Sequence, residues 1–311
     1  MIHRPPATAG ARAGLLRRVT GTGRLLAVRS SFAVLDLLAP DVAARRAMGL
    51  WVRLPGNPGR RKDFRPRTGV LSRVHAPTAG ADVVVETWGE EGAPVVYLAH
   101  GWGGWRGQMG AFVDPLLARG YRVVAFDSPS HGDAPPGAFG PGKGALTEVA
   151  EAFSVVSAEH GPAAGVIAHS MGCTTASMVL RDGLDAQALV LVAPNADILG
   201  ITRQFARMLG FGERTRTRLV GLLEDFTQCP IGDFDLGPMG ADGGMPPTLV
   251  VHDRHDKETA FAVGEAVAAA WPTAELVATE GLGHQRILAD AGVVERSVDF
   301  LARARAVTPG A

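Results

Sequence analysis

The stretch VIAHSMGC, residues 166–173, places Ser170 between an apolar run and a helix-like segment. Ala168 lies two residues before the serine and Gly172 two residues after it. This spacing is typical of a nucleophile on a tight strand-to-helix turn, where small residues are required because the strand and the helix approach closely. Ala168 adds only a methyl group where glycine is usual. The alternative is that Ser170 is an ordinary cap of the following helix.

A serine nucleophile needs a base and an acid that orients the base. His284, in TEGLGHQRIL, follows the last predicted strand, where an imidazole can take the Ser170 proton. LVVHDRHDKETAF offers two carboxylates. Asp256 lies in the loop after the strand and is favoured as the acid, whereas Asp253 ends the strand and is expected to cap the loop. Asp197, after the preceding strand, is a weaker rival.

An acyl-transfer site also needs donors for the oxyanion of its tetrahedral intermediate. The backbone N–H of Met171, directly after the serine, is one predicted donor. The second is the backbone N–H of Trp102, which follows His100 and Gly101 in LAHGWGGW. In isolation, this glycine-rich segment would be read as a turn.

These polar residues must be positioned by strands that end at a common edge. Apolar runs alternate with helical patterns, which predicts an α/β fold with a mostly parallel, doubly wound sheet covered on both faces. In such a sheet ligands bind at the carboxyl ends of the strands. Strands are expected at 82–88, 93–100, 121–126, 165–169, 188–193, 248–253 and 274–279, and helices near 106–118, 144–160, 171–181, 258–270 and 290–303.

Two regions lie outside this alternation. Residues 1–75 predict a basic helical N-terminal arm and a linker rich in proline, glycine and arginine. About fifty residues separate the strand ending at Ala193 from the one beginning near Thr248, too many for a simple connection. We therefore predict that residues 76–311 form the catalytic domain, with a small helical cap inserted at about 195–246.

The segment 81–303 resembles the α/β-hydrolase fold family, because AHGWGG, FDSPSHG, AHSMG, HDRHD and GLGHQ occur in that family's order. The resemblance implies that Ser170 is the nucleophile, Asp256 the acid and His284 the base, with the amides of Trp102 and Met171 as the oxyanion hole. It implies a serine esterase. The apolar and aromatic neighbourhood, with Trp102 and Trp105, suggests a small to medium, moderately hydrophobic ester as substrate. The same triad also serves thioesterases, amidases or peptidases, lactonases, C–C hydrolases and acyltransferases, and a ligand-binding protein on this scaffold is the non-enzymatic alternative.

Cofactors and metals are not expected. The segment GAFGPGKG, residues 137–144, has the glycines and lysine of a phosphate loop, but Gly144 replaces the required Ser or Thr. The histidines have no zinc-ligand spacing. Cys173 and Cys229 are the two cysteines, which argues against a disulfide framework.

Net charge is zero but unevenly distributed along the 311 residues. Residues 1–75 hold 15 Lys/Arg and 3 Asp/Glu, a net of +12, and the remainder balances them. The arm is expected either to dock on the acidic body or to contact an anionic membrane surface. No apolar run is long enough to span a bilayer, so a cytoplasmic protein is expected, with a small ester-like molecule rather than nucleic acid as its partner.

Overall fold

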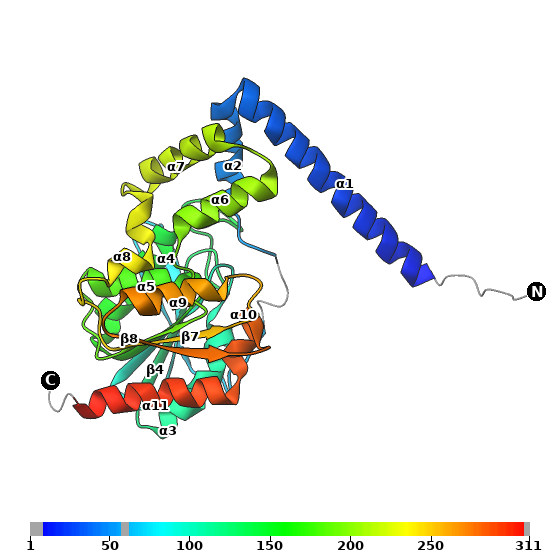
Figure 1. Ribbon diagram of the computed structural model, residues 1–311. Helices are drawn as coiled ribbons and strands as arrows, with labels where there is room; N and C mark the ends of the chain where they lie inside the picture. The colour runs from blue at the N-terminus through cyan, green and yellow to red at the C-terminus, as the bar shows by residue number, and fades with distance from the viewer. Residues whose placement is uncertain (1–8, 57–61, 308–311) are drawn as a thin grey trace, which may run out of the picture. The chain divides into compact units, whose positions relative to one another are not determined.

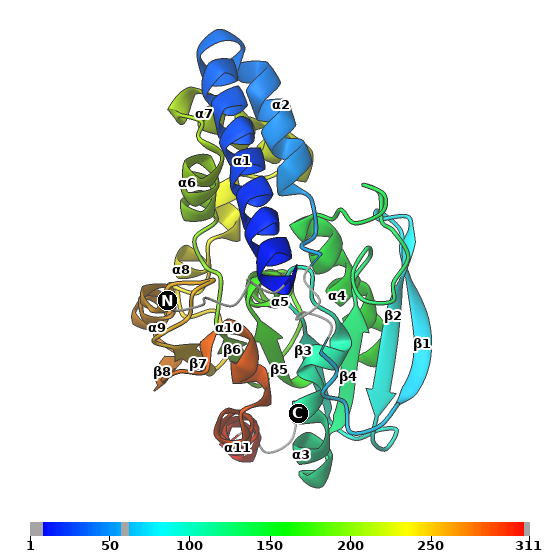
Figure 2. The same cartoon turned by 90° about the vertical axis from the view of Figure 1, so that its right-hand side faces the viewer.

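The computed structural model describes residues 9–56 and 62–307. Within them an eight-stranded sheet has the order β1-β2-β4-β3-β5-β6-β7-β8. The pairs β1–β2 and β2–β4 are antiparallel and the others are parallel. Figure 2 shows β1 at one edge of the sheet and β8 at the other. The strands are β1 (Val70–Ala76), β2 (Ala81–Trp88), β3 (Val95–Ala99), β4 (Arg122–Asp127), β5 (Ala163–His169), β6 (Leu189–Val192), β7 (Thr248–Asp253) and β8 (Ala274–Thr279).

Helices cover both faces of this sheet (Figure 1). One apolar core includes Phe153 and Val179, from α4 (Leu146–His160) and α5 (Met171–Arg181), and Val267 from α9 (Phe261–Ala270). The other includes Leu116 from α3 (Val113–Ala118) and Leu301 from α11 (Ala291–Val307). Two buried faces explain why the central strands are continuous apolar runs. The predicted α/β fold with a mostly parallel sheet is therefore confirmed.

Two local features differ from the expectation. Strand β1 was not predicted, because its sequence VLSRVHA alternates with charge and is largely exposed. The helix expected at 106–118 divides into a 3₁₀-helix, η2 (Arg106–Phe112), and α3. Gly107 and Gly110 lie within η2, and glycine weakens an α-helix by roughly 1 kcal/mol relative to alanine.

A separate compact unit is entirely helical. It contains α1 (Ala9–Leu38), α2 (Pro40–Trp51), α6 (Ile198–Leu209) and α7 (Glu213–Thr227). Phe32 of α1 is fully buried, and its ring centroid lies 5.4 Å from that of Phe211. Phe205 of α6 continues the cluster, with ring centroids 6.1 Å from Phe211 and 5.3 Å from Trp51. Aromatic packing thus joins helices that are far apart in sequence.

Side chains of α1 also satisfy the ends of the other helices in this unit. The Arg29 guanidinium donates to the carbonyls of Arg207 and Met208, at 2.7 and 2.8 Å, near the C-terminus of α6. The Asp36 carboxylate accepts the Thr215 N–H at 3.1 Å in the first turn of α7. Each contact places a charge where the helix dipole favours it.

Helices α6 and α7 fall in the predicted insertion between β6 and β7, together with η3 (Ile231–Phe234) and α8 (Leu236–Met239). The chain divides after Trp51, and the 199–229 segment joins α1 and α2 rather than the sheet unit. The domain boundaries at residue 75 and at 195–246 stay a prediction. Among the described helices, none has the length and apolar character needed to cross a bilayer.

Candidate active site

Ser170 lies on a sharp turn between β5 and α5. All seven residues of β5 are buried, and the strand pairs with β3 and β6 in the middle of the sheet. Ser170 has φ 55° and ψ −121°, a positive φ that non-glycine residues rarely adopt. Its side chain makes no capping hydrogen bond with α5. The geometry is therefore that of a strained strand-to-helix turn without a side-chain cap, as the sequence pattern around Ser170 predicts.

The turn depends on close backbone approach at two glycines. A Cβ atom on Gly172 would lie 2.5 Å from the His100 carbonyl oxygen. A Cβ on Gly101 would lie 2.9 Å from Cβ of Ser170. The start of α5 thus packs directly on the backbone that follows β3, and this contact brings the loop after β3 beside the serine.

The structure brings His284 to Ser170 across 114 residues of sequence. His284 is the second residue of the short helix α10 (Gly283–Arg286), and its Nε2 lies 2.9 Å from Oγ of Ser170. The ring is 6% exposed, which limits competition from water for this hydrogen bond. His169, the last residue of β5, bonds through Nε2 to the His284 carbonyl at 2.9 Å and so fixes the backbone of α10.

Asp256 lies on the other side of the His284 ring. Its Oδ2 is 2.7 Å from Nδ1 of His284, and its Oδ1 accepts the backbone N–H groups of Glu258 and Thr259. Burial would raise the pKa of the Asp256 carboxyl, but hydrogen bonds from His252 and His284 outweigh it and lower the pKa well below its ordinary value. A permanent carboxylate therefore faces Nδ1, which favours a proton on Nδ1 and leaves Nε2 free to accept one from Ser170.

The two rival carboxylates lie elsewhere. Asp253 accepts hydrogen bonds from His255 N–H, Thr279 Oγ1–H and Leu282 N–H, all at 2.9 Å, and so ties the loops after β7 and β8 together. Asp197 is exposed. Asp256 is the carboxylate that contacts the base.

The loop after β3 supplies the predicted oxyanion segment. Residues 100–106, which we call the oxyanion loop, run from the end of β3 to the start of η2. Trp102 follows Gly101, which packs on Ser170, and Met171 is the first residue of α5. Both predicted amides therefore belong to segments that meet at the serine.

A cavity of about 400 Å³ opens beside His284. It is lined by the loops after β7 and β8, residues 255, 257–258 and 281–286. Lys257, Glu258 and Arg286 give part of this lining a polar, charged character. A volume of this size is in the range of small-molecule sites.

The remaining polar residues of the sequence motifs have other partners. Asp127 accepts the backbone N–H of Arg106 at 2.6 Å and pairs with its guanidinium. Burial lowers the pKa of His131 to about 3, so this histidine is neutral. In the described part of the chain, no group of three or more His, Cys, Asp or Glu side chains is arranged to hold a metal ion.

Two histidines near the triad were missed from sequence. His169 holds α10 as described above, and fully buried His252 places Nε2 3.5 Å from Oδ2 of Asp256. Their signals were position alone: His169 directly precedes Ser170, and His252 is the next-to-last residue of β7, the strand before the loop that contains Asp256.

Comparison with known proteins assigns the chain to a family. The model of the alpha/beta hydrolase family matches residues 96–297. Because this is well over half of the chain, the protein belongs to the alpha/beta hydrolase family. No curated protein matches the chain in sequence.

Solved structures agree on the fold. Est1E from Butyrivibrio proteoclasticus, solved with ferulic acid, has a TM-score of 0.58 at 17% identity, over 76% of this chain and 99% of that one. An esterase from Thermogutta terrifontis has a TM-score of 0.56 at 18% identity, over 76% of this chain and 99% of that one. A bacterial membrane phospholipase A has a TM-score of 0.57 at 17% identity, over 93% of this chain and 99% of that one. At these identities the likeness establishes the fold alone.

Proposed function

We propose that this protein is a serine hydrolase that cleaves a carboxylic ester through an acyl-enzyme. The observation that carries the proposal is the continuous chain of contacts from Ser170 Oγ to His284 Nε2, at 2.9 Å, and from His284 Nδ1 to Asp256 Oδ2, at 2.7 Å. Nucleophile, base and orienting acid all lie within hydrogen-bond distance, as acyl transfer requires.

In the proposed mechanism, Ser170 Oγ attacks the ester carbonyl while His284 Nε2 takes its proton. The N–H groups of Trp102 and Met171 stabilise the oxyanion, and loss of one such donor costs on the order of 3 kcal/mol. Protonated His284, stabilised by the Asp256 carboxylate, then gives its proton to the leaving alkoxide. Water, activated by the same imidazole, releases the acid and regenerates Ser170.

The proposed substrate is a small to medium, moderately hydrophobic ester. The cavity of about 400 Å³ is lined by His284 and its neighbouring loops but not by Ser170, and it offers room for part of a molecule of this size next to the base. The half-buried Trp102 ring supports the apolar character, because it supplies aromatic surface next to a proposed oxyanion amide. Acetyl to dodecanoyl esters of p-nitrophenol test this: kcat/KM is expected to peak at intermediate length, and a flat or steadily falling series beyond acetyl would refute it.

The test of the mechanism is labelling and turnover at Ser170. Wild-type protein is expected to react with a fluorophosphonate and to hydrolyse p-nitrophenyl esters, whereas Ser170→Ala should lose both. Ser177→Ala is the matched control, because Ser177 lies buried on α5 seven residues further on. Unchanged ester turnover in Ser170→Ala would eliminate the mechanism.

A panel of esters, thioesters, amides and lactones separates the enzymes that share this triad. We expect esters to have the highest kcat/KM. A thioester or amide preference would keep the triad but change the reaction class. A protein that binds small ligands but resists fluorophosphonate would instead be a binding protein on this scaffold.

We also propose that the helical unit contacts an anionic membrane surface. Leu37 and Leu38, at the end of α1, are 71% and 79% exposed, and Val42 of α2 is 46% exposed. Arg45, one turn after Val42, is also exposed. Exposed leucines in a basic arm, in which residues 1–51 hold 8 Lys/Arg and 2 Asp/Glu for a net of +6, suit insertion into the headgroup region of anionic lipids. The similar membrane phospholipase A, matched over 93% of this chain, supports the same proposal.

Vesicle co-sedimentation tests this contact. The wild-type protein is expected to bind phosphatidylglycerol vesicles at low salt. Binding should be lost at high salt and with phosphatidylcholine vesicles. The double variant Leu37→Ser/Leu38→Ser should not bind. Val70→Ser/Leu71→Ser removes another exposed apolar pair, 72% and 54% exposed, from β1 of the sheet unit and should bind like wild type. Equal binding by both double variants would refute the proposed surface.

A cytoplasmic location stays a proposal. It is supported by the free thiols of Cys173 and Cys229, which are compatible with a reducing compartment. Cell fractionation tests it, and recovery of the protein from the medium or periplasm would refute it.

A further inference from the structure

The oxyanion loop is rich in glycine, which restricts its own backbone very little. Gly101, Gly103 and Gly104 occupy three of its positions, and Gly103 has φ +68°. Inside the loop, Gly104 N–H donates to the Gly101 carbonyl at 2.9 Å, and Nδ1 of His100 lies 2.8 Å from the same carbonyl oxygen. Glycine has greater backbone freedom than any other residue, so an amide held in this loop at a fixed position needs support from outside.

That support comes from residues 52–56 and 62–69, which lie outside the 96–297 region matched by the family. The Trp102 indole N–H donates to the Arg53 carbonyl at 3.3 Å. The Trp105 indole N–H donates to the Lys62 carbonyl at 3.0 Å. Pro55 packs against Gly103 so closely that a Cβ there would lie 2.6 Å from the proline ring. We call these two stretches the bracing segment.

The first stretch is itself anchored to the sheet unit. Gly144 N–H donates to the Val52 carbonyl, and Leu54 N–H donates to the Gly142 carbonyl, both at 2.9 Å. These bonds flank an antiparallel bridge between Arg53 and Lys143. The carbonyl that accepts the Trp102 indole is therefore held in a two-stranded pairing.

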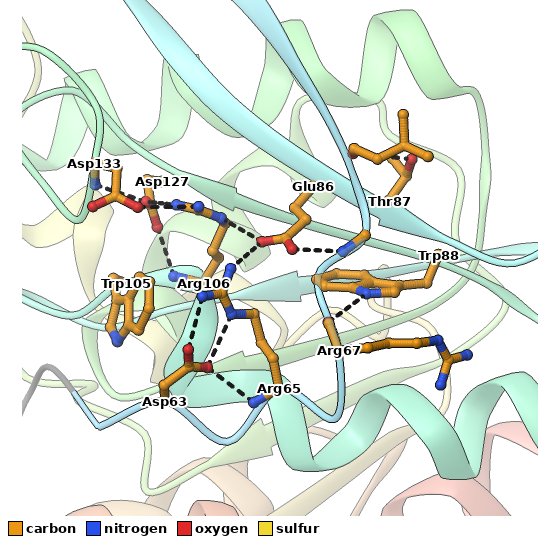
Figure 3. A network of polar contacts seen from close by, with 12 residues as sticks. Asp63, Arg65, Arg67, Glu86, Thr87, Trp88, Trp105, Arg106, Asp127 and Asp133 are labelled. Carbon is orange, nitrogen blue, oxygen red and sulfur yellow. Dashed lines mark hydrogen bonds and ion pairs between the residues drawn. The ribbon is translucent and has the colours of Figure 1, made fainter.

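The second stretch is anchored by Arg65, as Figure 3 shows. Its guanidinium bonds to Oδ2 of Asp63 and to Oε2 of Glu86, each at 2.7 Å, and lies 4.8 Å from the centroid of the Trp105 ring. The Glu86 side chain is completely buried on β2. Arg65 therefore joins the bracing segment, a rigid strand and an aromatic residue of the oxyanion loop.

Arg106 anchors the far end of the loop to the same group of charges. Its Nε lies 2.7 Å from Oε2 of Glu86, its guanidinium pairs with Asp127, and it lies 5.5 Å from the Trp105 ring centroid (Figure 3). Only 4% of the Arg106 side chain is exposed. Buried bonds of this kind hold geometry well, because breaking one leaves an unpaired charge.

We propose that Arg65 and Trp105 are positioning residues that hold the Trp102 amide in place for the oxyanion. This inference rests on the proposed hydrolase function. Arg65 acts through Trp105, whose fixed ring sets the course of the four residues from Trp102 to Trp105. Arg65 thus serves the site, although it lies 31 positions before residue 96, where the matched family region begins.

The test compares two arginines in the same segment. Arg65→Gln removes the contacts with Trp105 and Glu86, whereas Arg67→Gln makes the same charge change at a side chain that pairs with exposed Asp114. Fluorophosphonate titration counts working sites, so kcat refers to folded enzyme. Each variant is assayed for kcat, KM, the pH profile and inhibition by an alkyl boronic acid, which forms a tetrahedral adduct with the serine.

Arg65→Gln is expected to lower kcat and weaken boronic acid inhibition, each about tenfold, because a misplaced donor is felt in the transition state. KM should stay within about twofold and the pH profile unchanged, since Asp256 and His284 are untouched. Arg67→Gln should behave like wild type. Arg65→Lys keeps the charge but not the planar guanidinium, so its kcat and its boronic acid inhibition should lie between those of wild type and Arg65→Gln.

Equal kcat and equal boronic acid inhibition in Arg65→Gln and Arg67→Gln would overturn the inference, as would a rise in KM with kcat unchanged. If Arg65→Gln does not fold, Trp105→Phe provides the test, because it keeps an aromatic ring but replaces the indole by a smaller phenyl group and removes the N–H to Lys62. Its kcat should fall about threefold, and a wild-type value would overturn the inference. Failure of wild-type protein to react with fluorophosphonate would contradict the hydrolase proposal instead.

Discussion

Asp256 holds His284 through one carboxylate oxygen and its own loop through the other. Oδ1 accepts the amides of Glu258 and Thr259, so in Asp256→Asn the amide oxygen is expected to remain there and the NH₂ group to face Nδ1 of His284. The imidazole would then carry its proton on Nε2 and could not accept one from Ser170. We expect kcat to fall on the order of 10³–10⁴-fold with little change in KM.

Asp253→Asn provides the contrasting measurement. Asp253 bonds to the loops after β7 and β8 and not to the base, so its substitution weakens bonds to Leu282 and Thr279. We expect the free energy of unfolding to fall by roughly 1–3 kcal/mol, which lowers the melting temperature. Most of the activity per labelled site should be retained. The reverse pattern, with Asp253→Asn inactive and Asp256→Asn active, would assign the acid to Asp253.

Substitutions on the two sides of Ser170 should have unequal effects. Ala168 is fully buried on β5, and Ala168→Gly, which creates the usual glycine spacing, is expected to keep kcat and lose about 1 kcal/mol of stability. Gly172→Ala would force a Cβ to within 2.5 Å of the His100 carbonyl and should lose about 2–3 kcal/mol and most turnover. Thermal melts with site titration measure both, and a gain in kcat for Ala168→Gly would contradict this account.

Buried neutral histidines should make the fold sensitive to acid. Burial lowers the pKa of His100 to about 4 and that of His131 to about 3, against roughly 6.5 in an unfolded chain. Between pH 6.5 and 4 the unfolded state binds protons that the folded state excludes, so stability falls as pH falls. Each histidine contributes up to about 3 kcal/mol of this loss at pH 4.

The variant His131→Asn isolates one of these contributions, because its amide can still donate to the Pro129 carbonyl that His131 contacts at 2.9 Å. Urea unfolding from pH 7.5 to 4.5 is expected to show a shallower pH dependence than wild type. The value at pH 7.5 gives the cost of the substitution itself. Identical pH dependence in the two proteins would contradict the assigned pKa of His131.

The parallel core was readable from sequence because burial on both faces demands continuous apolar runs. Helix α5 begins at Met171 and ends at Arg181, as predicted. Strand β1 was not predicted, because an exposed edge strand such as VLSRVHA is not required to be a continuous apolar run. Local sequence also cannot report long-range pairing: the Arg29 contact with α6 joins residues 178 positions apart.

The contacts among Ser170, His284 and Asp256 could be expected from sequence, while their catalytic roles stay a proposal. Ser170, Asp256 and His284 each follow a strand, and chain order relates them to a known pattern. The bond from His169 to the His284 carbonyl has no such signal, since it depends on how two loops meet after folding. The contacts of Arg65 with Glu86 and Trp105 could not be predicted either, because a charged residue in a loop is most often solvated.

The packing of α1 on α6 and α7 can be tested by hydrogen exchange. Phe32 is fully buried against Phe211, so Phe32→Ala should cost about 3–5 kcal/mol within the helical unit. Amides of residues 199–227 are expected to exchange faster, while those of β5 and β7 keep wild-type protection. Leu38→Ala, at an exposed position of the same helix, is the control and should leave all protection unchanged. Unaltered exchange in residues 199–227 of Phe32→Ala would show that α6 and α7 are stable without α1.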